Sequence, residues 1–230
     1  MMKAYYDLHI HSCLSPCASH DMTPNNIVNM AILKGLDVIS VTDHNRALNV
    51  KAVMEVASKT NLIVIPGIEV ESLEGIHIVS YFKDLKSLLA FEATIYQHLP
   101  RVINSINLFN EQLIMNQDDE VIEIEELLLL NSTSIKIDKL VELTHQFGGI
   151  VSLAHLERYK NSIITILGFI PFDLKYEAVE SIHQHKYSKQ VLHNSDAHEL
   201  GEINEREYYL VVNDKSLNEV FRVLKGEDDA

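Results

Sequence analysis

Apolar and polar positions follow one another along the first half of the chain in a pattern that predicts strands and helices in turn. Short apolar runs rich in β-branched residues are typical of buried strands, whereas apolar residues spaced three and four apart indicate helices. Thr23 supplies a capping hydroxyl, Pro24 fits the first helical position, and Gly35 suits a helix end. We therefore expect strands at 3–11, 36–41, 62–70 and 76–82 and helices at 24–34 and 49–59.

The pattern changes between residues 84 and 147, where helical spacing dominates at 87–99 and 102–115. We interpret 84–147 as a helical insertion within a single domain that spans 1–230. Strands are expected again at 149–154, 177–182, 191–194 and 208–212, and a capping box of Ser216 and Glu219 predicts a last helix over 217–225. Alternating strands and helices predict an α/β fold with a parallel sheet, here a barrel of the TIM-like kind.

Composition agrees with a globular domain and excludes some classes of protein. The 230 residues are 47% hydrophobic, which is enough for a sizeable core. No apolar run reaches the roughly 18–20 residues of a membrane span, and the start of the chain lacks the apolar core of a signal peptide. We therefore expect a cytoplasmic protein without a membrane partner. Cys13 and Cys17 are too few for a disulfide framework, and we interpret them as packed or supporting groups rather than a redox pair.

The formal net charge of -14 argues against a long nucleic acid as partner, because an acidic surface repels a phosphate backbone. Metal ligands contribute part of this acidity, and bound divalent ions would reverse the local field. A small phosphorylated substrate therefore remains compatible with the charge.

Side chains able to bind metal recur at the ends of the predicted strands, where the working residues of α/β barrels lie. His-x-His in a strand places both imidazoles on one face, because side chains alternate with a period of two. Imidazole suits zinc, manganese and iron, and a carboxylate can bridge two ions. The strand-end residues are His9, His11, His44, Glu69, His155, Asp196 and His198.

At this point the chain resembles the PHP (polymerase and histidinol phosphatase) family of metal-dependent phosphoesterases. The matching segments occur in the family's order and span nearly the whole chain. They are Asp7-Leu8-His9-Ile10-His11-Ser12, Thr42-Asp43-His44, Gly67-Ile68-Glu69, His77, Ala154-His155 and Asn194-Ser195-Asp196-Ala197-His198. The resemblance implies a distorted (β/α)7 barrel that holds two or three divalent ions, which we expect to be zinc, manganese or iron.

The resemblance also implies how the ligands are shared. His9, His11, Glu69 and Asp196 would hold one ion, and Glu69 would bridge to a second ion held by His77 and His155. His44 and His198 would hold a third ion with one further ligand. The family usually has His or Asp for that ligand, and the matching stretch here departs from the pattern, with candidates Cys17, Ser19, His20 and Asp21. We predict Asp21, because it supplies charge and lies just before the helix start at Thr23.

Several other polar residues have plausible supporting roles. Asp7 and Asp43 flank ligand histidines, and we expect them to orient imidazoles or backbone rather than bind metal. Arg158 follows His155 closely, and a guanidinium beside a metal cluster suits a phosphate; the alternative is a surface ion pair. Lys160 and Arg46 are weaker candidates for that contact. We interpret His183 and His185 as a polar loop, His98 and His145 as surface residues, and His193 as a strand residue.

These observations predict an enzyme that hydrolyses phosphomonoesters or small nucleotides by means of a metal-bound hydroxide, with Arg158 as a catalytic residue. Two alternatives remain: an exonuclease on short oligonucleotides, and a non-catalytic regulatory module that binds metal. The filled ligand positions favour an enzyme over the regulatory module. The acidic balance, and the lack of basic patches interleaved with aromatic residues, count against the exonuclease.

Overall fold

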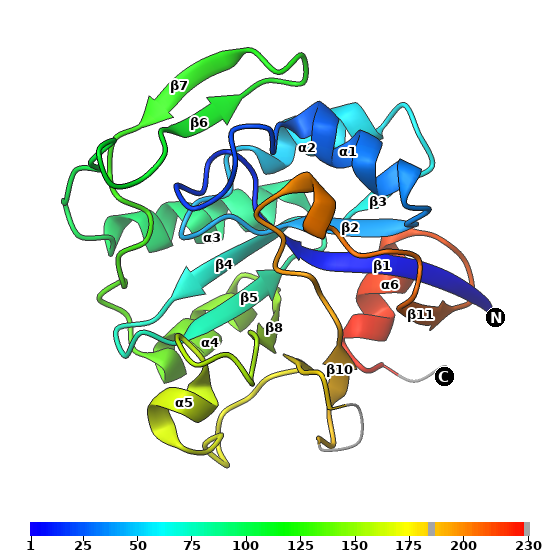
Figure 1. Ribbon diagram of the computed structural model, residues 1–230. Coiled ribbons are helices and arrows are strands. Elements are labelled where there is room, and N and C mark those ends of the chain that lie inside the picture. The colour runs from blue at the N-terminus through cyan, green and yellow to red at the C-terminus, as the bar shows by residue number, and fades with distance from the viewer. Residues whose placement is uncertain (184–186, 228–230) are drawn as a thin grey trace.

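The computed structural model describes residues 1–183 and 187–227, and it forms a mixed α/β fold with two main sheets (Figure 1). The first sheet has the order β11-β1-β2-β3. In it β1, β2 and β3 run parallel, and β11 pairs antiparallel with β1. The strands are β1 (Met2–Ile10), β2 (Val38–Val41), β3 (Ile63–Val64) and β11 (Tyr209–Val212).

The second sheet has the order β10-β9-β8-β5-β4 and mixes both strand directions. Strands β8, β9 and β10 are parallel, whereas β5 pairs antiparallel with both β4 and β8. The predicted parallel sheet is therefore only partly correct. The strands are β4 (Gly67–Glu71), β5 (His77–Tyr81), β8 (Ile150–Leu153), β9 (Ala178–Glu180) and β10 (Gln190–Leu192).

Two isolated β-bridges connect the two sheets near the ends of β1 and β2. His44 pairs with Glu69, and Ile10 pairs with Ala197, both in parallel orientation. The strand ladders of the described residues do not close into a ring, so the predicted barrel is not confirmed. The bridges nevertheless bring the ends of β1, β2 and β4 and the chain after β10 to one place.

Helices cover the sheets, and two of them begin where the capping residues of the sequence predict. Thr23 caps α1 by accepting a hydrogen bond from the backbone N–H of Asn26, and Ser216 caps α6 in the same way from Glu219. In Figure 1, α1 and α2 lie beside β1 and β2, and α6 lies beside β11. The helices are α1 (Pro24–Leu33), α2 (Val50–Ala57), α3 (Leu85–Gln97), α4 (Ile137–Gln146), α5 (Ile163–Leu167) and α6 (Leu217–Leu224), with a 3-10 turn, η1, at Leu200–Glu202.

The segment 84–147 contains strands as well as helices. The helix predicted over 102–115 is wrong: the segment ends in β6 (Gln112–Met115), which pairs antiparallel with β7 (Val121–Glu125). Ile114 packs in one small apolar cluster with Leu14 and Leu99, whereas Leu113 and Met115 pack in another with Cys13, as expected for alternating residues of a strand. The hairpin follows α3 and precedes α4, and it stands apart from the two main sheets in Figure 1.

The single strand predicted over 62–70 is also divided. β3 ends at Val64, and β4 begins at Gly67 and joins the other sheet. Pro66 lies between them and has no N–H to donate to a ladder, which favours a break at this point. The break directs β4, and with it Glu69, across the ends of β1 and β2.

Among the helices of the described residues, none combines the length and apolarity that crossing a membrane requires.

Candidate metal centre

Eight of the predicted metal ligands converge at one end of the two sheets. Ligand atoms fall into three overlapping groups, each with its atoms within 4.8 Å of one another. The groups are His9, His11 and Asp196; His44, Glu69 and His77; and His11, His44 and His198. His155 completes the set, because its Nε2 lies 3.3 Å from Glu69 Oε1 and 3.3 Å from His77 Nδ1.

The first group consists of His9 in β1, His11 just after β1, and Asp196 in the chain after β10. The Nε2 atoms of His9 and His11 are 3.1 Å apart, and Asp196 Oδ1 lies 3.3 Å from the first and 3.1 Å from the second. Both imidazoles are fully buried. The period-two geometry of the strand thus points both rings at one carboxylate, as the His-x-His spacing predicts.

Glu69 lies at the centre of the cluster. Its Oε1 is 2.8 Å from His77 Nδ1 and 3.4 Å from His9 Nε2, and its Oε2 is 2.9 Å from His44 Nδ1. Gly67 allows this placement, because a Cβ at that position would collide with the side chain of Ser40 and lie 2.8 Å from Thr42. β4 therefore passes close enough to β2 for one carboxylate to face imidazoles from several strands.

The third group consists of three histidines that the sequence predicts as ligands. The rings of His44 and His198 both lie against His11, with centroids 4.4 and 4.3 Å from it. Asp21 is exposed, and its backbone N–H donates to Ser19 Oγ at 3.2 Å. Cys17 is likewise exposed, and the ligand groups found among the described residues include neither Cys17 nor Asp21, so the choice of Asp21 stays a prediction.

The charges in the cluster are strongly coupled. Burial opposes ionisation of Glu69, but the imidazoles of His77, His9 and His44 outweigh it and hold the pKa of this carboxyl well below its usual range. Burial likewise opposes protonation of His9, yet Glu180, Asp196 and Glu69 raise its pKa well above the usual value. Burial, together with His44 and His198, lowers the pKa of His11. Such opposed shifts within one cluster are typical of functional sites.

Two buried carboxylate oxygens of the cluster lack a partner with hydrogen-bond geometry among the described residues, namely Glu69 Oε2 and Asp196 Oδ2. Their nearest charged neighbours are His44, whose Nδ1 lies 2.9 Å from Glu69 Oε2, and Arg158, which forms an ion pair with Asp196 Oδ2. Buried charged oxygens are costly unless hydrogen-bonded or bound to metal. The donor set, imidazole nitrogens with two carboxylates, is also the one that zinc, iron and manganese accept. The residues therefore fit divalent metal ions.

Neighbouring side chains fix the outer faces of these imidazoles. His9 Nδ1 lies 3.0 Å from both oxygens of Glu180, and His77 Nε2 lies 3.0 Å from Glu71 Oε2. His11 Nδ1 meets Ser15 Oγ at 3.0 Å. Orienting partners of this kind turn the other ring nitrogen toward the metal and raise its basicity. The role of Glu180 was not predicted from the sequence. The predicted strand at 177–182 nevertheless points alternate residues, Ala178 and Glu180, to one side.

Asp7 and Asp43 hold backbone and hydroxyl groups around the cluster, as predicted. Asp43 accepts hydrogen bonds from Ser12 Oγ and Ser15 Oγ at 2.6 and 2.7 Å, so it orients the serine that meets His11. Asp7 accepts from Ser195 Oγ at 2.6 Å and from the backbone N–H of Asn204. Burial raises the pKa of both carboxyls, and these hydrogen bonds oppose that rise.

Replacing Glu180 by Gln should weaken metal binding without unfolding the protein. His9 would keep a hydrogen-bond partner but lose the carboxylate that raises its basicity, and loss of such a partner typically costs about 10–100-fold in metal affinity. Equilibrium dialysis against zinc or manganese would measure the change. Glu177→Gln is a matched control. The Glu177 carboxylate lies 3.2 Å from His145 Nε2, and this pair is outside the cluster. Equal metal affinities in the two variants would show that Glu180 does not support metal binding.

Arg158 lies at the rim of the cluster. Its guanidinium forms an ion pair with the carboxylate of Asp196, and its side chain is 48% exposed. It lines a hollow of about 260 Å³ together with His155, Asn194, Asp196 and Tyr208. The cation therefore faces a predicted metal ligand and an open space, rather than Glu157 on the surface.

The two backbones that carry the last ligands adopt an uncommon conformation. His155 has φ of 30° and Asp196 has φ of 55°, both in the left-handed region. Such non-glycine residues cluster at functional sites, where the surroundings hold them in place.

Other histidines of the described residues lie outside the cluster. His98 is exposed and bonds Ser134 Oγ, His145 on α4 is half-buried beside Glu177, and His193 stacks on Tyr208 with ring centroids 4.6 Å apart. His183 is exposed, and His185 lies outside the described residues. Arg46 is engaged elsewhere, because it pairs with Glu92 and Glu125 and covers the ring of Tyr96.

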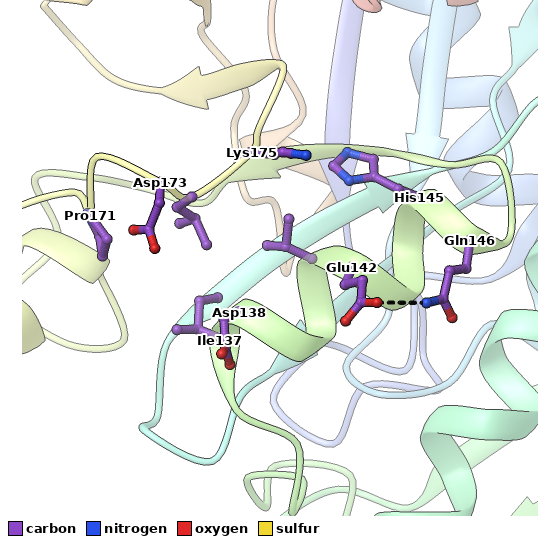
Figure 2. Close-up of a pocket in the computed structure, with 10 residues that line it drawn as sticks. Ile137, Asp138, Glu142, His145, Gln146, Pro171, Asp173 and Lys175 are labelled. Carbon is purple, nitrogen blue, oxygen red and sulfur yellow. Dashed lines mark hydrogen bonds between the residues drawn. The ribbon is translucent and has the colours of Figure 1, made fainter.

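A second hollow, of about 520 Å³, lies between α4 and the chain from Pro171 to Lys175 (Figure 2). Its lining includes Ile137, Val141 and Leu174, and Glu142 accepts a hydrogen bond from Gln146 at its edge. The predicted metal ligands of the described chain do not line it, so it is separate from the centre described above.

Comparison with known proteins agrees with this geometry. The family model for the PHP domain matches residues 7–224, and the chain belongs to this family. No curated protein matches the chain. Members of the family are hydrolases that act on phosphoesters and bind divalent metals, and the clusters above could hold such ions.

Three solved structures share the fold. A lesion-specific endonuclease from Pyrococcus furiosus is 19% identical with a TM-score of 0.70, over 99% of this chain and 57% of that one. An endonuclease Q in complex with a 27-mer duplex is 18% identical with a TM-score of 0.67, over 99% and 57%. A protein proposed to be a metal-dependent phosphoesterase, from Bifidobacterium adolescentis, is 15% identical with a TM-score of 0.62, over 96% of each chain. The present chain thus spans little more than half the length of the endonucleases.

Proposed function

We propose that the protein hydrolyses small phosphoesters at a centre of two or three divalent ions. The observation that carries this proposal is Glu69, a buried carboxylate whose oxygens face His9 of β1, His77 of β5 and His44 just after β2. One carboxylate in that position can serve two ions at once. When bound, the ions supply charge stabilisation to a phosphoryl group and lower the pKa of a water molecule.

The proposed ligands are the eight clustered residues, with zinc, manganese or iron as the metal. His9, His11 and Asp196 would hold one position with Glu69, and His77 and His155 a second position that shares Glu69. We further propose that the two sheets and their bridges represent the distorted (β/α)7 barrel with an interrupted ladder, a single domain into which 84–147 is inserted.

The hollow beside the cluster supports a small substrate. Its volume of about 260 Å³ is just below the roughly 300–1,000 Å³ of ordinary ligand pockets. Arg158 is the cation at this hollow, and its planar guanidinium suits two oxygens of a phosphate. On binding, the phosphate would replace Asp196 as its partner and would be held beside the ligand carboxylate. Arg158 would thereby orient the phosphoryl group and stabilise charge that develops on it.

Replacing Arg158 by Ala should lower kcat/KM for phosphoesters by about 10–100-fold, the equivalent of a charge-assisted hydrogen bond of about 1.5–3 kcal/mol. Metal content should stay unchanged, because the residue is not a ligand. Steady-state kinetics on several phosphoesters, with metal analysis of the same samples, would measure both. Lys139→Ala is the control, since Lys139 is an exposed cation on α4 that pairs with Glu142 and does not line this hollow. If the variant and the control have equal kcat/KM, Arg158 does not contact the substrate and forms only a surface ion pair.

A nucleotide or short oligonucleotide is the second candidate substrate. The stacked rings of His193 and Tyr208, both of which line the same hollow, offer an aromatic surface on which a base can stack. The net charge of -14 disfavours a long nucleic acid, which would meet repulsion away from the centre.

The decisive experiment is a substrate screen on metal-loaded protein. Phosphomonoesters, nucleotides and short oligonucleotides would be supplied in parallel with manganese or zinc, and release of phosphate or shortened product measured. Hydrolysis of a phosphoester that a chelator abolishes is the expected result. Metal binding without hydrolysis of any member of the screen would instead support a regulatory metal-binding module.

A further inference from the structure

Asn49 lies at the N-cap of α2, but its side chain does not cap the helix. Asparagine at this position ordinarily accepts a hydrogen bond from a backbone N–H group of the first turn. The structure, which describes the whole of α2, shows no such bond to the side chain of Asn49. The side chain is instead fully buried. Because buried amides are costly unless hydrogen-bonded, the role of Asn49 is found in the groups that its amide meets.

The amide of Asn49 joins the hairpin β6-β7 to the segment just after β1. Its Oδ1 accepts a hydrogen bond from the backbone N–H of Met115 at 2.8 Å, and its Nδ2 donates to the backbone carbonyl of Leu113 at 2.9 Å. The same Nδ2 donates to Ser12 Oγ at 2.9 Å. Ser12 is the residue after His11, so one side chain connects a strand of the insertion to the neighbour of a proposed metal ligand.

From Ser12 the hydrogen bonds continue to His11 through Asp43. Ser12 Oγ donates to Asp43 Oδ2 at 2.6 Å, and Ser15 Oγ donates to Asp43 Oδ1 at 2.7 Å. Each hydroxyl has a single proton, and the bond to Asp43 uses it. Each serine is therefore the acceptor in its other side-chain contact, Ser12 from Asn49 and Ser15 from His11 Nδ1 at 3.0 Å. All five side chains are fully buried.

This direction of the hydrogen bonds selects the nitrogen that His11 offers to a metal. Its Nδ1 carries the proton that Ser15 accepts, so its Nε2 keeps the lone pair. That Nε2 lies 3.1 Å from Asp196 Oδ1, inside the cluster. Without the Asn49 amide, the Ser12 hydroxyl could rotate, and the hydrogen bonds that follow it would no longer be fixed.

We propose that Asn49 is a positioning residue that links the placement of the hairpin β6-β7 to the orientation of the His11 imidazole. It acts through the two serines and Asp43 and is not itself a ligand. The proposal rests on the proposed metal centre but not on its reaction. It gives the insertion 84–147 a part in metal binding, although none of the predicted ligands lies there.

The expected effect is selective. His11 belongs to two of the three ligand groups, whereas the position proposed for Glu69, His77 and His155 does not contain it. Asn49→Ala should weaken ions held by His11 by about 10-fold, the lower end of the about 10–100-fold that loss of a partner that orients a ligand costs. The ion at the other position should keep its affinity. Lower stability alone would not weaken one position selectively in a protein that is still folded.

Titration calorimetry of the metal-free full chain with Zn²⁺ would measure these affinities, at a temperature where circular dichroism shows every variant folded. Gln112→Ala is the matched control. Gln112 is also fully buried and holds the same hairpin, but its side chain bonds to backbone groups of Glu125, Leu127 and Leu129, all within the insertion. The control should lose stability and keep the zinc affinities of the unmodified protein.

Ser12→Ala breaks the same connection without removing the contacts of Asn49 with the hairpin, so it tests the proposal even if Asn49→Ala folds poorly. Ser12→Ala and the double variant should each lose about 10-fold in zinc affinity, rather than the roughly 100-fold that independent effects would give in the double variant. Affinities equal to those of Gln112→Ala would overturn the proposal, as would losses that multiply in the double variant. A chain that binds no Zn²⁺ would overturn the metal centre itself and this role with it, so the two failures are distinguishable.

Discussion

Replacing Glu69 by Gln should remove most of the hydrolytic activity while leaving the fold intact. Glu69 is 1% exposed, and its two oxygens face different imidazoles, with Oε1 at 2.8 Å from His77 and Oε2 at 2.9 Å from His44. Glutamine has nearly the same shape but carries no charge, and its amide NH₂ presents protons where a cation is needed. Turnover should fall by about 10³-fold or more, at or beyond the upper end for loss of one electrostatic group in a preorganised site.

Metal analysis and steady-state kinetics of the same preparation would test this prediction. Glu92→Gln is the control, because Glu92 is also buried, at 4% exposure, but pairs with Arg46 away from the cluster. The control should keep its metals and turnover even if it loses some stability. A folded Glu69→Gln protein with its metals in place and near-normal turnover would show that Glu69 does not bridge two ions.

Removing the metal ions should destabilise the protein substantially. Without cations, the buried carboxylates of Glu69 and Asp196 have only imidazoles and Arg158 to balance them. An ion present at about 1,000 times its Kd stabilises the folded state by about 4 kcal/mol. For a chain of this size, each kcal/mol shifts Tm by about 2–4 °C, so chelation of one such ion should lower Tm by about 8–16 °C.

Differential scanning calorimetry before and after chelation would measure the shift. Zinc or manganese added back should restore Tm, whereas magnesium at the same concentration should not, because it prefers oxygen ligands in octahedral geometry. An unchanged Tm in protein shown to be metal-free would mean that the cluster does not depend on cations for its folded form.

Much of the metal centre could be predicted because its residues occupy strand ends. The order of His9, His11, His44, Glu69 and His155 along the chain follows the order of β1, β2, β4 and β8, and each of these strands or the residues just after it delivers one or two side chains to the same place. Local sequence therefore carries the information, since a strand sets both the direction and the alternation of its side chains.

The choice between Cys17 and Asp21 could not be made in this way. Which residue of the loop meets His44 depends on contacts of Pro16 with Asn110 and of Ser19 with His198, more than 90 positions distant along the chain. Charge alone favoured Asp21, and in the structure Asp21 and Cys17 are both exposed on the loop, so the choice between them stays a prediction.

The hairpin β6-β7 was missed for a different reason. The sequence from Ile122 to Glu125 alternates apolar and acidic residues, which is a period-two signal, but helical spacing dominated the interpretation of residues 84–147. In the structure Val121, Ile122 and Ile124 are exposed and Glu125 is buried beside Arg46. Prediction from periodicity assumes that the apolar residues of a strand face inward. Here the buried residue is Glu125, which pairs with Arg46, and the apolar residues face outward.

The left-handed backbone at His155 and Asp196 restricts how these two positions can change. Only glycine adopts this conformation at little cost, and Asn, Asp and His tolerate it better than other residues. A β-branched replacement would meet steric strain of about 1–3 kcal/mol before any effect on a ligand is counted. The set of acceptable residues is thus narrowed twice, once by the backbone and once by coordination chemistry. Asparagine at 196 would meet the first requirement and fail the second, which makes it a means of separating the two constraints.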